Sequence, residues 1–300
     1  MEYFLILSTL GECPTLTIDS DRFLLLKASK RILAEALAVE EEYEMVIYNY
    51  IDLEKESINV SISHMVRNYR GYVDSFDVRL ALNRRFMNLL TSVRLYTDQL
   101  TAHCIACLPK ESGIKERVNL LFSTEYDKNF DYRFMEALRN HIQHYGTAVH
   151  HVMFGGRWTA LDGNGLLEYL SSFTAEKKVI ASDGHFKKQV LDEMPEKVDL
   201  ISASRGYIEA VSSIHNNARK MISKSVNEAR ALIQTAIDDY RAAYKKDFVG
   251  LSAYIFDGNI KIDETQIFLN WDDIRIELEK RNNQLVNLKK RYVTGQVKKE

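Results

Sequence analysis

The sequence predicts a mainly α-helical protein, a helical bundle in which long antiparallel helices carry small β-hairpin insertions. Several long stretches repeat apolar residues every three to four positions, as one face of a helix does. Proline and glycine are scarce, with 3 and 13 in 300 residues, which disfavours disorder and a turn-rich all-β fold. Short β-prone stretches with glycine-containing turns interrupt the helical pattern, which indicates small hairpins.

Bulk properties exclude several classes of protein. With 46% apolar residues, the chain can bury one large core or two modest ones. The net charge of -2 provides no general attraction for nucleic acid, so any such contact requires a local patch. The N-terminal apolar stretch is too short for a secretory signal or a membrane span, and three cysteines form no disulfide framework. We therefore expect a soluble cytoplasmic protein that does not enter a membrane.

The first part of the chain predicts two strands followed by a long helix. "YFLILSTL" (3–10) and "PTLTI" (14–18) are rich in β-prone residues and are separated by Gly and Pro. From about Asp21 to Lys55, apolar residues recur at helical spacing between many glutamates.

The middle of the chain carries the strongest periodic pattern. Apolar residues step by threes and fours from Asp77 to about 108, where Pro109 ends the predicted helix. Residues 115–130, "KERVNLLFSTEYDKNF", predict a linker with little local order. A shorter helix is expected from Asp131 to Tyr145, and Gly146 is expected to end it as the residue after the cap.

The last part of the chain predicts two further helices and two hairpin regions. One or two hairpins are expected in "AVHHVMFGGRWTALDGNGLLEYLSSF" (148–173), and another in "AYIFDGNIKID" (253–263). A long helix is expected over 199–244. Residues 272–292 predict one amphipathic helix that leads into a basic tail.

The two closely spaced cysteines are predicted to be core residues. Cys104 and Cys107 form a C-x-x-C pair, but no second pair completes a tetrahedral zinc site. Both also fall on the apolar stripe of the helix expected over 77–108, and free cysteine is among the most buried residue types. The sequence gives no set of ligands for a metal or another cofactor.

A polar helix face stands out in the segment "LRNHIQHYG" (138–146). On a wheel of about 100° per residue with Leu138 at zero, Arg139 and Gln143 fall at about 100° and 140°. Asn140, Arg133 and His144 fall at about 200°, 220° and 240°, opposite the apolar side. The helix is thus expected to have one core face and one face with two arginines, an amide and a histidine.

These residue types can act together on a phosphodiester. Histidine exchanges protons near neutral pH, and arginine offers a permanently charged fork for phosphate. With an amide to orient them, they are the groups needed to cleave RNA through its own 2′-hydroxyl without a metal. A solvated polar helix face is the alternative interpretation, because an R-x4-H spacing is not specific by itself.

The segment Arg139 to His144 reads R-N-x-x-x-H, which resembles the signature of the HEPN superfamily. The surrounding "EYDKNFDYRFMEALRNHIQHYG" is similar to a stretch found in a group of bacterial HEPN-like proteins, and "NRRFMNLLTSVRLYTDQL" (83–100) is similar to the preceding long helix of that group. The resemblance covers about 76–150, and extends less clearly to 199–244.

The resemblance implies a usually dimeric helical bundle, often a metal-independent endoribonuclease of toxin–antitoxin, phage-defence or stress-response systems. It implies that His144 is the acid–base group, that Arg139 stabilises charge on the phosphate and that Asn140 orients them, where two protomers meet. Arg133 and Gln143 are added from the wheel as substrate-binding residues. RNA is the expected substrate, a homodimer the expected assembly, and a regulatory protein a possible partner.

Two other functions remain open at this stage. Some HEPN domains are not catalytic, so the chain is alternatively an interaction or sensor module whose helices at 77–108 and 199–244 dock a partner protein. Otherwise Arg139 and His144 hold the phosphate of a bound nucleotide. The expected organisation is a β segment plus long helix at 1–70, a HEPN-like helical domain at 71–247 with a β insertion near 148–180, and a hairpin plus amphipathic helix at 248–300.

Overall fold

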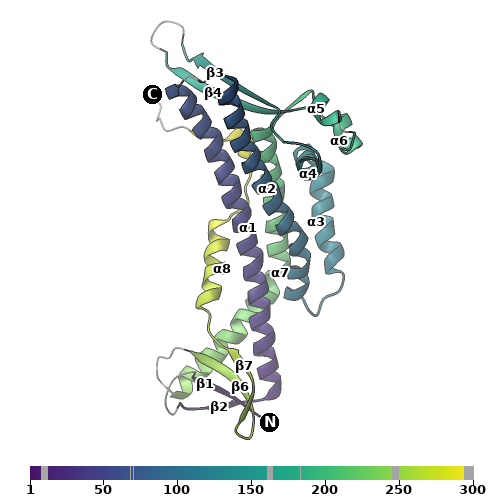
Figure 1. Ribbon diagram of the computed structural model, residues 1–300. Helices are drawn as coiled ribbons and strands as arrows, with labels where there is room; N and C mark the ends of the chain where they lie inside the picture. The colour runs from purple at the N-terminus through teal and green to yellow at the C-terminus, as the bar shows by residue number, and fades with distance from the viewer. Residues whose placement is uncertain are drawn as a thin grey trace. The chain divides into compact units, whose positions relative to one another are not determined.

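The computed structural model describes residues 1–7, 13–67, 69, 71–160, 165–182, 184–244 and 250–293. This part of the chain is mainly helical, with small antiparallel sheets, as the sequence predicts (Figure 1). The helices are α1 (Ser20–Arg67), α2 (Tyr72–Cys107), α3 (Ile114–Lys128), α4 (Phe130–His144), α5 (Lys177–Ala181), α6 (Lys188–Glu193), α7 (Leu200–Tyr244) and α8 (Asn270–Arg281). The strands are β1 (Glu2–Leu7), β2 (Leu16–Ile18), β3 (His151–Trp158), β4 (Leu167–Glu176), β5 (Lys197–Asp199), β6 (Leu251–Asp257) and β7 (Ile260–Gln266). Among the described residues, no helix combines the length and apolar character that a membrane span requires.

The chain forms two compact units that are interleaved along the sequence. Unit 1 contains Met1–Glu42, Asp98–Asn119 and Asn216–Asn283, and unit 2 contains Tyr43–Thr97, Leu120–His215 and Gln284–Glu300. Each of the three segments expected from the sequence, 1–70, 71–247 and 248–300, therefore contributes residues to both units.

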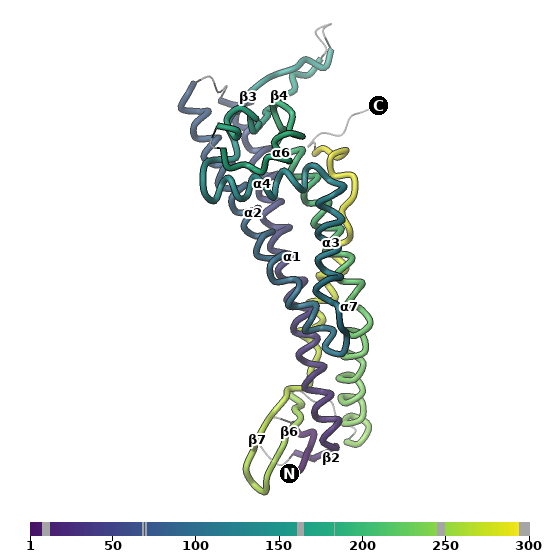
Figure 2. The backbone as a smooth tube through the Cα atoms, turned by 90° about the vertical axis from the view of Figure 1, so that its right-hand side faces the viewer, coloured from purple at the N-terminus to yellow at the C-terminus, as the bar shows by residue number. Residues whose placement is uncertain are grey.

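Unit 1 holds a four-stranded antiparallel sheet with the strand order β2-β1-β6-β7. The N-terminal strand β1 lies in the middle, where Tyr3 pairs with Ile18 of β2 on one side and with Ile255 of β6 on the other. Gly258 turns the β6–β7 hairpin with φ +58°, a conformation that glycine adopts without strain. Figure 2 shows this hairpin from the side. Both predicted strands near the N-terminus and the hairpin at 253–263 are confirmed; residues 8–10 of the first stretch lie outside the described residues.

The helical part of unit 1 is held by charged pairs as well as by apolar packing. Arg219 of α7 donates from Nε and Nη2 to the Glu40 carboxylate of α1 at 2.8 and 2.6 Å, and Glu40 is only 2% exposed. Both cysteines of the C-x-x-C pair are fully buried, as predicted. Burial raises the thiol pKa of Cys104 to about 11 and that of Cys107 to about 12, so both remain protonated at neutral pH.

Unit 2 combines parts of the long helices with α4, α5, α6 and a three-stranded sheet ordered β3-β4-β5. Strands β3 and β4 pair over their length, from His151 with Thr174 to Trp158 with Leu167, which confirms a hairpin in 148–173. Most of the turn "DGNG" lies outside the described residues. Arg85 of α2 pairs with Asp52 and Glu56 of α1 at 3.2 and 3.4 Å, so these two helices lie side by side within unit 2.

Two expectations about local structure are wrong. Residues 115–130 belong largely to a helix, α3, rather than to a linker, because Ile114 and Val118 are buried one turn apart and supply a small apolar face. The helix expected over 272–292 ends at Arg281, and only a short 3-10 turn follows at Leu288–Lys290. There the amide of Leu285 donates to Ser212 Oγ at 2.8 Å and that of Leu288 donates to Glu209, which replaces the hydrogen bonds of a continued helix.

A histidine between two carboxylates makes the stability of unit 1 depend on pH. His103 Nδ1 contacts Glu35 at 2.7 Å and Nε2 contacts Glu42 at 3.1 Å, so both contacts are satisfied only when the ring is protonated. Burial alone would lower the pKa of His103, but the hydrogen bonds and charges of Glu35 and Glu42 outweigh it and raise that pKa above its ordinary value.

We predict that His103→Gln destabilises the protein by about 1 kcal/mol at pH 6 and by less at pH 8.5. A raised pKa in the folded state adds stability that is present below the ordinary pKa of 6.5 and is lost as pH rises through the raised value. Urea unfolding at both pH values measures the difference. The exposed His151→Gln is the matched control, and an effect of His103→Gln that is equal at both pH values would contradict the prediction.

Candidate functional site

The helix that carries the R-N-x-x-x-H motif begins at an asparagine cap. Asn129 Oδ1 accepts hydrogen bonds from the amides of Asp131 and Tyr132 at 3.0 and 3.4 Å, which satisfies two of the free N–H groups at the start of α4. Its Nδ2 donates to the carbonyl oxygen of Gly206 in α7 at 3.3 Å. One side chain thus sets both the first residue of α4 and its position against α7.

The apolar side of α4 is buried, as the helical wheel predicts. Phe134, Met135 and Leu138 are fully buried. Next to them, the hydroxyl of Tyr207 in α7 donates to Glu136 at 2.5 Å. Burial and the negative charge of Glu136 hold the pKa of Tyr207 well above its ordinary value, so the hydroxyl stays a donor at any physiological pH. This contact was not expected from the sequence.

Arg133 ties α4 to the end of α3. Its Nη1 donates to the carbonyl oxygens of Tyr126 and Asp127 at 2.6 and 2.8 Å, and these are among the last carbonyls of α3. Its Nη2 pairs with Glu193 of α6 at 2.6 Å. The side chain is only 13% exposed, so the expectation that Arg133 lies on the open polar face is wrong. A positive group at a helix C-terminus is favourable because unpaired carbonyls and the helix dipole meet there.

The C-terminal end of α4 brings Arg139, Asn140, Gln143 and His144 together. Arg139 donates from Nη1 to Gln143 Oε1 at 3.0 Å and from Nη2 to Asn140 Oδ1 at 2.5 Å. Both acceptors are neutral amide oxygens and not carboxylates. The guanidinium is therefore fixed in place while its positive charge is not neutralised.

His144 is the last residue of α4 and is exposed, together with Asn140 and Gln143. Its ring lies 5.9 Å from the ring of Tyr145, and it forms no hydrogen bond with the part of the chain that the structure describes. An exposed imidazole without a fixed partner can accept or donate a proton to a bound molecule. Of the five residues expected at the site, the structure thus brings four to one helix end and places Arg133 about 9 Å away along α4.

Aromatic side chains that the sequence did not single out border this helix end. Tyr145, expected on the core face, is half exposed, and its ring stacks on that of His185 with centroids 4.4 Å apart. The segment after α5 that carries His185 leads into α6, and α6 packs on α4 (Figure 1). The chain separation of 40 residues explains why helical spacing could not reveal His185.

Gly146 ends α4 for a different reason than expected. Gly146 does not adopt a positive φ. Four other glycines do: Gly113, Gly184, Gly250 and Gly258. A Cβ atom at Gly146 would instead lie 2.7 Å from Nε2 of the buried His141, so the ring of His141 leaves no room for a side chain. The amides of Tyr145 and Gly146 both donate to the carbonyl of His141 and close the helix.

Histidines near this helix end do not form a metal site. Burial lowers the pKa of His150, whose Nδ1 accepts from the amide of Glu176 at 2.9 Å and whose Nε2 contacts the Thr147 carbonyl. Over the described ranges, no group of three or more His, Cys, Asp or Glu side chains is arranged to hold a metal ion.

Comparison with known proteins gave no significant match among protein-family models, curated proteins or solved structures. The resemblance to the HEPN superfamily thus depends on the sequence motif alone.

We predict that Arg133→Ala lowers the free energy of unfolding by about 2 kcal/mol, because it leaves two carbonyls of α3 and Glu193 without their donor. Thermal and urea unfolding measure the loss. Arg157→Ala is the matched control, since Arg157 is 71% exposed in its pair with Glu168 and its loss is expected to cost less than about 0.5 kcal/mol. Unchanged stability of Arg133→Ala would contradict this structural role of Arg133.

Proposed function

We propose that the protein is a metal-independent endoribonuclease of the HEPN type. Arg139, Asn140 and His144 form its catalytic group, and Gln143 supports them. The observation that carries the proposal is the pairing of Arg139 with two neutral amides beside an exposed histidine at the same helix end. An anion-binding charge and a proton-transfer group thus lie about one and a half turns apart on the same helix, and phosphodiester cleavage requires both.

The reaction follows from the chemistry of these groups. A neutral imidazole of His144 removes the proton from the 2′-hydroxyl of RNA, and the 2′-oxygen attacks the adjacent phosphorus. The bond to the 5′-oxygen breaks, and the products are a 2′,3′-cyclic phosphate and a 5′-hydroxyl. Arg139 stabilises the charge that develops on the phosphate oxygens, since its fork matches phosphate geometry and cannot lose its proton.

A second copy of the chain would complete the site. One imidazole cannot remove the proton from the 2′-hydroxyl and protonate the leaving oxygen in the same step. His144 of a partner copy is the proposed donor, and a homodimer is therefore the proposed assembly. Arg133 does not enter this mechanism, because Glu193 neutralises its charge.

We predict that purified protein cleaves single-stranded RNA in the presence of a chelator. His144→Ala and Arg139→Ala should each slow cleavage by about 100-fold or more, because each removes a group that acts in the transition state. Mass spectrometry of the fragments should find 2′,3′-cyclic phosphate ends.

The matched controls are His151→Ala and Arg157→Ala, which remove an exposed histidine and an exposed arginine that belong to β3 and not to α4. Cleavage that proceeds equally well in both α4 variants would contradict the proposed site. A wild-type protein that leaves varied RNAs intact would contradict the activity itself.

A second candidate function, a module that docks a partner, is favoured by the exposed apolar side chains on two helices of unit 2. Large apolar side chains that are 37–80% exposed occupy the outer faces of α1 and α2. On α1 they are Met45, Tyr48, Ile51, Ile58, Ile62, Met65 and Val66, and on α2 they are Tyr72, Val73, Phe76, Leu80, Met87 and Leu95. We call this set the α1–α2 apolar face.

The size of the α1–α2 apolar face is that of an interface. A half-exposed large apolar side chain presents roughly 100 Å², so the set presents on the order of 1,000 Å², compared with roughly 800 Å² per partner in a standard complex. A regulatory protein or a second copy of the chain would cover it. On α7, the other long helix expected to dock a partner, Tyr207, Val211 and Ile214 are buried and Leu232 is 42% exposed.

We predict that Leu80→Glu weakens self-association or partner binding at least tenfold, because it places a charge in the centre of an apolar contact. Sedimentation velocity over a range of concentrations measures the self-association. Leu120→Glu is the matched control, since Leu120 is equally exposed on α3 outside the α1–α2 apolar face. Equal behaviour of the two variants would exclude the face as an interface.

A further inference from the structure

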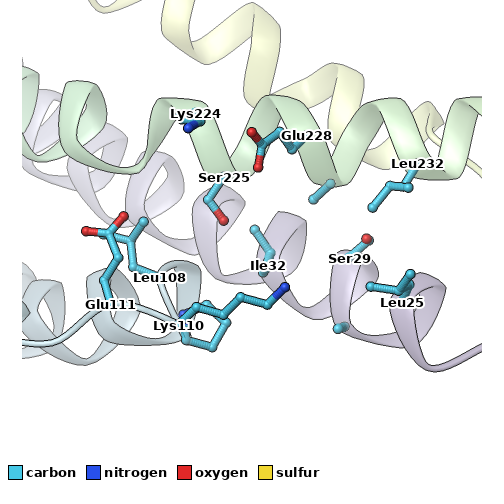
Figure 3. A pocket seen from close by; sticks show the side chains of 13 residues that line it. Leu25, Ser29, Ile32, Leu108, Lys110, Glu111, Lys224, Ser225, Glu228 and Leu232 are labelled. Atoms are coloured by element: carbon cyan, nitrogen blue, oxygen red, sulfur yellow. The ribbon is translucent and has the colours of Figure 1, made fainter. Parts of the chain in front are cut away.

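Unit 1 contains a cavity that neither proposed function uses. It has a volume of about 250 Å³ and lies between α1, the turn that joins α2 to α3, and α7 (Figure 3). This is just below the roughly 300–1,000 Å³ of ordinary ligand pockets, so it suits a molecule of about ten non-hydrogen atoms. All of the residues that line it belong to unit 1.

The walls of the cavity are apolar. Leu25 and Ile32 come from α1, Leu108 and Pro109 from the turn after α2, and Leu232 from α7. Leu25 and Leu232 are 45% and 42% exposed, and Figure 3 shows them on opposite walls of the cavity, from α1 and α7. A hydrocarbon group placed between them would remove apolar surface of both from water, which favours binding.

Ser29 adds a specific polar group to this apolar lining. It is only 3% exposed, and Figure 3 shows its hydroxyl between Leu25 and Leu232. Ser29 lines the cavity, and across it Ser225 donates to the Cys107 carbonyl at 2.6 Å. A hydroxyl in an otherwise apolar part of a cavity wall can donate a hydrogen bond to a polar atom of a ligand, which fixes the orientation of that ligand.

The charges at the rim define which polar group would fit. Lys110 and Lys224 line the cavity, and neither forms an ion pair with a described residue. Figure 3 shows Lys110 extending across the cavity towards Ile32. Of the two carboxylates at the rim, Glu111 pairs with Arg117 at 2.6 Å. The remaining carboxylate, Glu228, can balance the charge of only one of the two lysines. This balance favours a single negative charge and disfavours a dianion.

We propose that the cavity binds a small amphipathic carboxylate, with a hydrocarbon body of about seven carbons. The carboxylate would receive a hydrogen bond from Ser29 and the charge of Lys110, while the hydrocarbon lies against Leu25, Ile32 and Leu232. Because the ligand would contact α1, the α2–α3 turn and α7 at once, its binding stabilises the folded form of unit 1. The proposal is independent of RNA cleavage.

Titration calorimetry and thermal unfolding of the 300-residue protein with sodium octanoate test the proposal. We expect saturable binding with a Kd between about 10 μM and 1 mM and a concentration-dependent rise in Tm. Octylamine, which has the opposite charge, and the neutral 1-octanol should bind at least tenfold more weakly. Equal affinity for octanoate and 1-octanol would overturn the carboxylate assignment, and no saturable binding of octanoate would overturn the site.

Three substitutions locate the site. Ser29→Ala and Lys110→Met should each weaken octanoate binding about five- to tenfold, and Ala229→Phe should abolish it by filling the cavity. Lys115→Met, an exposed lysine on α3 outside the lining, is the control and should bind as the wild type does. Circular dichroism shows whether Ala229→Phe folds. If it does not, the octanoate affinities of Ser29→Ala and Lys110→Met test the proposal. Wild-type affinity in both of them would overturn the proposal.

Discussion

The candidate site depends on how the guanidinium of Arg133 joins three helices of unit 2. It donates to the last carbonyls of α3 and pairs with Glu193 of α6, while Asn129 caps the first turn of α4. These contacts set the direction of α4 relative to α3. They also hold α6 against the side of α4. The residues of the R-N-x-x-x-H motif follow about two to three turns later on the same helix. The contacts of Arg133 and Asn129 therefore also fix the position of the motif.

Arg133 and Arg139, the two arginines on α4, differ in the acceptors of their guanidinium groups. Arg133 meets a carboxylate and helix carbonyls, and its charge is used within the fold. Arg139 meets two amide oxygens, which orient it and leave its charge for an external anion. Residue type and exposure alone would not separate them. The nature of the acceptor does, and it is the physical reason why the proposed chemistry rests on Arg139.

Two further features of the molecule lie outside the C-terminal end of α4. The α1–α2 apolar face belongs to unit 2, and the cavity around Ser29 belongs to unit 1. An interface for a second copy would be a condition for the proposed nuclease, because it supplies the second imidazole. A ligand that stabilises unit 1 would give the same chain a way to respond to a small molecule. These roles are compatible, and each is tested by different variants.

The sequence by itself determined the helices and hairpins whose patterns are local. The long helix at 199–244, the hairpin at Asp257–Gly258, the buried Cys104 and Cys107, and the apolar face of α4 all follow from spacing that neighbouring residues create. The exposed positions of Asn140, Gln143 and His144 follow from the same wheel.

Only the tertiary structure decided the features that depend on contacts between residues far apart in the sequence. Whether Arg133 faces solvent depends on Glu193, 60 residues away, and the stack on Tyr145 depends on His185. The helix expected over 272–292 ends early because Ser212 and Glu209 accept the amides of Leu285 and Leu288. Helical periodicity reports which side of a segment is apolar. It does not report which distant polar group will hydrogen-bond to a backbone amide or pair with a charged side chain. Those contacts form only when the helices and strands pack against one another.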